Sequence, residues 1–300
     1  MRAIVIDSHQ HFWDPRSFVY PWMSPKVQPL VRAFLPPDIA PLLAESGVDR
    51  TIVVQAISSA SEAKWLLQLA SENEFIGGVV AWCDIQDPRL GSVLDELQMH
   101  RKFKGIRHQI EDEPQGDWML RDKVKNGFKE LERRGIPYDM LVRPEHLKYL
   151  RAVRDRCPGL KLVIDHIAKP DIAGHVFEPW ALEIEQVGQL PGVFCKLSGM
   201  STQADWATWG ADDLKPYVQH VVKTFGYDRV MFGSDWPVCM LAAEYKQIVD
   251  TLKQALGPLS SEREALVWGG NARSFYDLED IVIQTDIDHR QPAPAKENRR

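Results

Sequence analysis

Eight short runs rich in apolar and β-branched residues alternate with helix-like segments, and this alternation constrains the fold more than any other feature. The runs lie at residues 3–9, 50–56, 77–85, 104–110, 136–142, 161–167, 193–199 and 230–236. Most are continuously apolar, which is typical of parallel strands covered by helices. Eight strand–helix units in series favour a closed α/β fold, the (β/α)8 or TIM barrel, which takes about 250 residues. The 300 residues of this chain accommodate one such barrel.

The segments between the runs carry helix signals. Residues 35–47 begin with prolines and end at a glycine, and residues 122–135 end in two arginines and a glycine; both patterns favour helices. Further helices are expected at 61–73, 87–98, 143–159, 178–190, 212–226 and 242–257, with an additional C-terminal helix at 260–276. An open doubly wound sheet is the alternative, but the GxGxxG motif that often accompanies it is missing after the first strand.

We predict one barrel domain over residues 1–278 and a polar, flexible tail over 279–300. The first loop, residues 12–35, is rich in Trp, Pro and Tyr and is expected to fold over the mouth of the barrel. A net charge of −6 argues against nucleic acid or an anionic membrane as a partner. No secretory segment or membrane-length apolar stretch is evident, and the four cysteines form no CxxC pair. Free thiols in a reducing cytoplasm are therefore expected.

Polar side chains gather at the C-terminal ends of the predicted strands, where TIM barrels place their active sites. His9 and His11 end the first strand, and a period of two residues turns both imidazoles to one side. Two hydrogen-bonded histidines would explain this pair alone, but uncompensated charges near a core are costly. A shared polar site explains the whole set better. Its other members are Gln55, Asp84, Arg107, His108, Gln109, Asp165, His166, Lys196, Ser198, Ser234 and Asp235.

These motifs resemble the amidohydrolase superfamily, which combines an HxH pair after strand one with a histidine near strand six and an aspartate closing strand eight. DSHQHFWD, VAWCDI, KGIRHQ, LVIDHIAKP, FCKLSG, MFGSDWPV and GGNARSFYDL are similar to stretches of the fuconolactonase-type sugar-lactone hydrolases, across residues 4–278. The HxH pair is generic, whereas GIRHQ, DHIAKP and GSDWP together are more specific. The resemblance implies hydrolysis of an aldonolactone, such as L-fuconolactone or L-rhamnonolactone, to the sugar acid.

Lactone hydrolysis needs a base for water, a polarised carbonyl and a stabilised oxyanion. We predict Asp235 as the general base; its alternative role is a helix N-cap. With Asp235, the histidines His9, His11 and His166 would form the shell of one divalent metal ion, with zinc as the first choice. Catalysis without metal stays open, because the same histidines can hydrogen-bond the carbonyl directly. No nucleotide or organic cofactor is expected.

The substrate would meet donors, acceptors and aromatic faces from several strand ends. The predicted binding residues are Arg107, His108, Gln109, Lys196, Gln55, Trp13, Trp82 and Trp236, with Lys169 as a further cation near the mouth. The planar guanidinium of Arg107 and the mobile ammonium of Lys196 could bind the hydroxyl groups of a sugar ring. The indole faces of the tryptophans could contact its C–H surface. Each of these residues also has a structural alternative, such as an Arg107–Asp84 ion pair or tryptophans in the core.

Two other functions stay open at this point. One is a non-hydrolytic decarboxylase on the same barrel, although a carboxylated substrate would recruit more arginines to the mouth than Arg107. The other is a non-catalytic carbohydrate-binding protein, against which the intact set of histidines and aspartate argues. Other templates are missing: there is no GxSxG, P-loop or HExxH motif. The expected partner is a small sugar lactone, and assembly as a homo-oligomer stays open.

Overall fold

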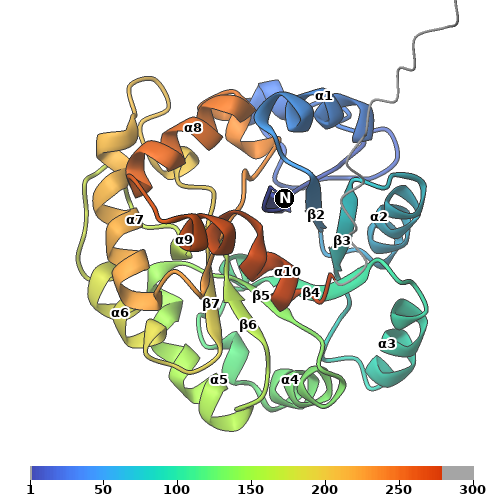
Figure 1. Ribbon diagram of the computed structural model, residues 1–300. Helices are drawn as coiled ribbons and strands as arrows, with labels where there is room; N and C mark the ends of the chain where they lie inside the picture. The colour runs from blue at the N-terminus through green and yellow to red at the C-terminus, as the bar shows by residue number, and fades with distance from the viewer. Residues whose placement is uncertain (1, 279–300) are drawn as a thin grey trace, which may run out of the picture.

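Figure 1 shows a barrel of parallel strands surrounded by helices. The computed structural model describes residues 2–278. Its strands are β1 (Ile6–Gln10), β2 (Arg50–Val54), β3 (Ile76–Ala81), β4 (Phe103–Gln109), β5 (Tyr138–Leu141), β6 (Leu162–Ile164), β7 (Val193–Leu197) and β8 (Val230–Phe232). They form one eight-stranded sheet in the order β1 to β8, with parallel neighbours throughout. The predicted (β/α)8 fold is confirmed, and the predicted tail lies outside the described residues.

The outer ring of helices follows the predicted segments. It consists of α1 (Pro36–Ser46), α2 (Ala60–Glu72), α3 (Leu90–Gln98), α4 (Asp122–Arg134), α5 (Leu150–Arg156), α6 (Trp180–Gly188), α7 (Ala211–Phe225) and α8 (Tyr245–Leu256). The helix expected at 143–159 is shorter, because a 3-10 turn (Pro144–Tyr149) precedes α5.

The additional C-terminal helix is present and contains a π-helical turn. A π-helical turn (Leu266–Gly270) separates α9 (Ser261–Ala265) from α10 (Asn271–Phe275). At this turn the backbone of Gly269 lies against Ile4, where an added Cβ atom would lie 2.1 Å from the Ile4 carbonyl oxygen. The two consecutive glycines are poor helix formers, and the wider turn permits this close approach.

The interior of the barrel is apolar at the end near α10. Ile6, Val80, Val163 and Met231 come from strands that are not all neighbours, yet they pack in one cluster with Phe275 of α10. Such contacts can form only inside the barrel. Figure 1 shows α9 and α10 crossing in front of the strands, so the C-terminal helices cover this end. The other end is left for the polar strand-end residues.

The barrel closes where the chain's first strand meets the segment after its last. His11 N donates to the Trp236 carbonyl at 2.7 Å, and Asp235 N donates to the His9 carbonyl at 2.8 Å. A side-chain contact supports the same seam, because Ser234 N donates to the Asp7 carboxylate at 2.9 Å. The seam therefore brings the two ends of the predicted site together.

The first loop packs through its aromatic residues. Trp13 forms an isolated bridge with Phe34, and its indole donates to the Leu30 and Arg32 carbonyls at 3.1 and 2.9 Å. All four cysteines are buried and free, as expected. Among residues 2–278, no helix combines the length and apolar character needed to cross a membrane.

Candidate active site

His9 and His11 point into the barrel because β1 carries a bulge. Asp7 pairs with Thr51 and Gln10 pairs with Val53, so β1 has one more residue than β2 between these two pairs. Before the bulge, the side chain of Ile6 faces the interior of the barrel. The bulge shifts the alternation of side chains by one residue, so that the side chains of His9 and His11 also face the interior. The Nε2 atoms of the two histidines lie 3.2 Å apart.

The tautomer of His11 follows from its partner. Its Nδ1 lies 2.7 Å from the Val54 carbonyl oxygen, which can only accept a hydrogen bond. Nδ1 therefore carries the proton, and in the neutral ring Nε2 presents a lone pair. That lone pair faces His9 and the carboxylate described next.

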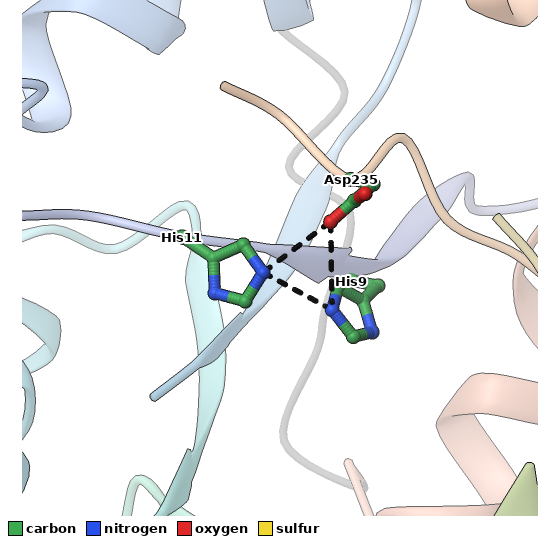
Figure 2. A group of neighbouring side chains, drawn as sticks. All are labelled: His9, His11 and Asp235. Carbon is green, nitrogen blue, oxygen red and sulfur yellow. Dashed lines mark hydrogen bonds and ion pairs between the residues drawn. The ribbon is translucent and has the colours of Figure 1, made fainter. Parts of the chain in front are cut away.

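Asp235 completes this group from the far end of the chain, as Figure 2 shows. It follows β8 with a φ of 59°, in the left-handed region that aspartate tolerates better than most residues. Its Oδ1 lies 3.3 Å from His11 Nε2 and 3.8 Å from His9 Nε2. Three potential ligand atoms thus converge on one point.

His166 approaches the same carboxylate from a left-handed turn after β6. Its Nε2 lies 3.8 Å from Asp235 Oδ1, and its Nδ1 lies 2.9 Å from Ser198 Oγ. Residues 166–169 all have positive φ, between 49° and 61°. Gly199 makes room for the ring, since an added Cβ atom would lie 2.5 Å from His166 Nδ1. Non-glycine residues keep such strain only where their surroundings hold it, often at functional sites.

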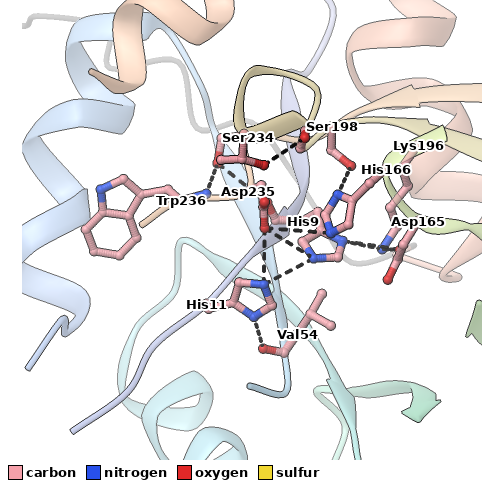
Figure 3. A network of polar contacts seen from close by, with 12 residues as sticks. His9, His11, Val54, Asp165, His166, Lys196, Ser198, Ser234, Asp235 and Trp236 are labelled. Atoms are coloured by element: carbon pink, nitrogen blue, oxygen red, sulfur yellow. Dashed lines mark hydrogen bonds and ion pairs between the residues drawn. The ribbon is translucent and has the colours of Figure 1, made fainter. Parts of the chain in front are cut away.

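A buried network of opposite charges holds His9 from behind. Lys196 Nζ lies between Asp139 and Asp165, at 2.5 and 3.0 Å, and 3.1 Å from His9 Nδ1. Arg107 Nη1 donates to Asp165 at 3.1 Å and lies 3.3 Å from His9 Nε2. Figure 3 shows Lys196 and Asp165 beside the imidazole of His9. Because the charges compensate one another, the network can remain buried.

The cluster combines neutral imidazoles with an ionised carboxylate at neutral pH. Burial lowers the pKa values of His9 and His11, and it lowers that of His166 to about 4. Burial also raises the pKa of Asp235, but contacts with His166 and His11 outweigh this effect and hold it well below its usual range. Asp235 is therefore available as a proton acceptor.

The donor atoms fit one divalent metal ion. The lone pair of His11 Nε2 faces the Asp235 carboxylate at 3.3 Å, and two acceptors at that distance repel unless a cation lies between them. Ligands about 2.0–2.1 Å from a tetrahedral zinc ion lie about 3.3 Å apart. His9, His11 and Asp235 meet this spacing well, with their ligand atoms within 4.8 Å of one another. A second group, in which Asp165 joins His9, is less suitable because Asp165 already pairs with two cations.

The cluster opens into a cavity of about 200 Å³. The first loop contributes Trp13, Trp22, Val27 and Leu30 to its wall. Its other lining residues are His11, Ala56, Arg107, Gln109, Glu111, Asp112, Leu141, His166, Lys169, Asp235, Val238 and Leu241. The cavity therefore combines indole and aliphatic surface with several charged groups, as ligand sites commonly do.

The structure brings some predicted binding residues to this cavity and places others beneath it. Arg107, Gln109 and Trp13 line the wall. Lys196 is fully buried, and the Gln55 side chain donates to the Arg107 carbonyl at 3.4 Å. Arg107 pairs with Asp165 rather than with Asp84.

Besides Gln55 and Lys196, three more predicted binding residues lie outside the cavity lining. Trp82 donates from Nε1 to His108 Nδ1 at 3.1 Å, and His108 stacks on Trp118 with ring centroids 4.5 Å apart. Trp236 is buried against Phe12 and Phe34. These side chains contact other protein side chains rather than the cavity.

Sequence reasoning missed several members of the site. Asp165 was visible at a strand end but received no role. Asp139, a single acid in the apolar fifth run, and Glu111, just after GIRHQ, could have been found by the same search for polar residues near strand ends. Tyr276, whose hydroxyl donates to Asp139 at 2.8 Å, carries no local signal in the sequence.

Comparisons with known proteins identify the family of this chain. A family profile described as amidohydrolase matches residues 6–278. An L-fucono-1,5-lactonase of Burkholderia ambifaria is 36% identical over 287 residues, covering 91% of this chain and 96% of the relative. A crystal structure of a Burkholderia multivorans amidohydrolase with bound zinc is 35% identical, with a TM-score of 0.87 over 92% of this chain and 99% of that one.

A more distant structure is that of a 5-carboxyvanillate decarboxylase from Novosphingobium aromaticivorans. It is 14% identical, with a TM-score of 0.65 over 92% of this chain and 97% of that one, a likeness that shows the fold alone. The family profile, by contrast, extends from β1 to the end of the described residues and includes His9, His11, His166 and Asp235. The chain belongs to the amidohydrolase family.

Proposed function

We propose that this protein hydrolyses a sugar lactone, such as L-fuconolactone or L-rhamnonolactone, to the open-chain sugar acid. One observation carries the proposal: Asp235 and the imidazoles of His9, His11 and His166 converge beside a cavity walled by indole and charged groups. The relative named as an L-fucono-1,5-lactonase supports the same substrate class. The likeness to a decarboxylase, at 14% identity, gives that alternative less support.

Asp235 acts as the proton acceptor in this mechanism. Its ionised carboxylate takes a proton from water as the water oxygen attacks the lactone carbonyl carbon. When the bond between that carbon and the ring oxygen breaks, Asp235 returns the proton to the leaving oxygen. Acid and base steps of this kind contribute about 10²- to 10⁴-fold to a rate.

His9, His11 and Asp235 would hold a divalent metal ion, with His166 beside it. We propose zinc, because the ligands are two imidazole nitrogens and one carboxylate oxygen. A metal ion bound there would supply Lewis-acid polarisation and a lower pKa for water, so that the weakly basic Asp235 carboxylate would suffice as the acceptor. The positive charge of Arg107, which lines the cavity, stabilises the oxyanion that develops on the carbonyl oxygen.

The walls of the cavity orient the sugar. Trp13 and Trp22 present indole surface to its C–H groups, and Gln109 offers an amide to its hydroxyl groups. A cytoplasmic location and a homo-oligomeric assembly remain expectations from the sequence.

The proposal is tested with a panel of 1,4- and 1,5-aldonolactones, following acid release with a pH indicator and subtracting spontaneous hydrolysis. We expect turnover of at least one 6-deoxy aldonolactone, loss of activity with a chelator, and recovery on adding zinc. Absence of turnover with every lactone would refute the lactonase assignment. Full activity in chelator would instead refute the metal and leave the histidines as direct hydrogen-bond partners of the carbonyl.

A further inference from the structure

A second pair of charged residues, Glu111 and Lys169, lines the same cavity. Lys169 Nζ donates to Glu111 Oε1 at 2.6 Å. Arg143 Nε lies 3.4 Å from Glu111 Oε2 on the other side. The mechanism above uses none of these groups.

The Glu111 carboxylate is buried but not fully hydrogen-bonded. Its side chain is 10% exposed, and that of Lys169 is 17% exposed. Within the described part of the chain, Glu111 Oε2 has no hydrogen-bond donor and keeps only the longer contact with Arg143. A buried oxygen atom that accepts no hydrogen bond destabilises the folded protein unless a further donor binds to it.

The backbone connects this pair to the metal-binding cluster. Lys169 is the last residue of the left-handed turn that begins at His166. This strained turn delivers an imidazole and an ammonium group to one cavity, three residues apart. Burial raises the pKa of Glu111, but the charge of Lys169 outweighs this effect and lowers the pKa below its ordinary value, so the carboxyl group is ionised at neutral pH.

We propose that Glu111 and Lys169 bind the hydroxyl groups of the substrate and select polyhydroxylated lactones. Glu111 Oε2 accepts a hydrogen bond from one hydroxyl, and a free N–H of Lys169 donates to a hydroxyl oxygen. The inference rests on the proposed lactonase function and adds the substrate feature that this cavity recognises. A carboxylate beside an ammonium is suited to a diol, which offers a donor and an acceptor together.

The test combines substitution of Glu111 in the enzyme with removal of single hydroxyl groups from the substrate. Values of kcat/KM are measured for the parent aldonolactone and for its monodeoxy analogues, with wild type and Glu111→Gln. In the wild type, removal of the hydroxyl that meets Glu111 lowers kcat/KM about 10- to 100-fold, the effect of one hydrogen bond to a charged group. In Glu111→Gln, which acts poorly on the parent lactone, removal of that same hydroxyl has little further effect.

Glu113→Gln is the matched control. Glu113 lies two residues further along, bonds His108 Nε2 at 2.8 Å, and does not line the cavity. This variant retains the wild-type response to each monodeoxy lactone. The double variant Glu111→Gln with Lys169→Met removes both charges together, so it tests the same selectivity without leaving an unpaired buried charge.

The outcomes separate the two proposals. If every monodeoxy lactone affects Glu111→Gln and the double variant as strongly as wild type, the pair only anchors the turn and the inference is wrong, while the lactonase function stands. If the wild type hydrolyses no lactone at all, the proposed function is refuted and this inference with it.

Discussion

Asp235 is the side chain on which the proposed chemistry depends most. Asp235→Asn keeps the size of the group and tolerates the positive φ of 59° at this position. It removes the proton acceptor and weakens the metal shell, so we expect kcat/KM to fall by about 10²- to 10⁴-fold. Steady-state hydrolysis of the best lactone measures the loss, and circular dichroism verifies the fold.

Asp171→Asn serves as the control for this substitution. Asp171 is exposed and accepts a hydrogen bond from Gly174 N at 2.8 Å, outside the cavity lining. Its variant retains wild-type turnover. A folded Asp235→Asn enzyme that hydrolyses lactone at the wild-type rate would show that another group is the base.

Single residues also show how far sequence could predict the site. His9, His11, His166 and Asp235 were found because each lies at a strand end and the fold brings such ends together. The bulge in β1 turns both histidines inward, and neither the composition nor the hydrophobic periodicity of the sequence predicts it. His108 has the same sequence signal, yet it faces Trp82 and Trp118, because side-chain direction depends on packing between elements.

At the scale of elements, Glu62 ties the start of α2 to the loop after β2. Its carboxylate accepts hydrogen bonds from Ala56 N and Ile57 N at 3.0 and 3.1 Å, and Ser59 caps the helix through Glu62 N at 3.2 Å. Ala56 lines the cavity, so this contact positions part of its wall. Burial is the main cause that raises the pKa of Glu62, to about 7.

This raised pKa predicts a pH-dependent stability. The folded-state pKa of Glu62 lies above its unfolded value of 4.5, so its contribution to stability is fully present below pH 4.5 and is lost as pH rises through about 7. Glu62→Gln stays neutral at every pH. Between pH 5 and pH 8 we expect wild type to lose about 2–3 kcal/mol of unfolding free energy relative to Glu62→Gln.

Urea unfolding of both proteins at pH 5 and pH 8 measures this difference, in which all other titrating groups cancel. Parallel stability curves for wild type and Glu62→Gln would mean that the carboxyl is already ionised at pH 5 and that burial does not control it.

The elements themselves were largely predictable, and the exceptions have local causes. Apolar runs located all eight strands, because parallel strands covered by helices are apolar throughout. The C-terminal helix was predicted over residues 260–276, but the π-helical turn inside it was not, since the contact of Gly269 with Ile4 is a long-range feature. The helix at 143–159 was predicted too long, because the 3-10 turn Pro144–Tyr149 before α5 has helix-like composition.

For the whole molecule, the candidate metal ligands lie on both sides of the seam that closes the barrel. His9 and His11 belong to the first strand, Asp235 follows the last, and backbone hydrogen bonds of 2.7 and 2.8 Å join the two segments. An ion held there would join the two ends of the fold as well as serve chemistry. Metal binding should therefore stabilise the folded state, because the unfolded chain does not bring these ligands together.

A thermal unfolding series tests this link between the site and the fold. Zinc at about 100 times its Kd adds about 2.7 kcal/mol to the folded state, which for a chain of this length raises Tm by about 5 °C. A chelator should reverse the rise, and Asp235→Asn should lose most of it. His175→Asn is the control, because His175 is exposed and its φ of 52° is one that asparagine tolerates, so this variant keeps the full response. If zinc raises the Tm of the Asp235→Asn variant as much as that of wild type, the zinc binds elsewhere and does not stabilise the seam.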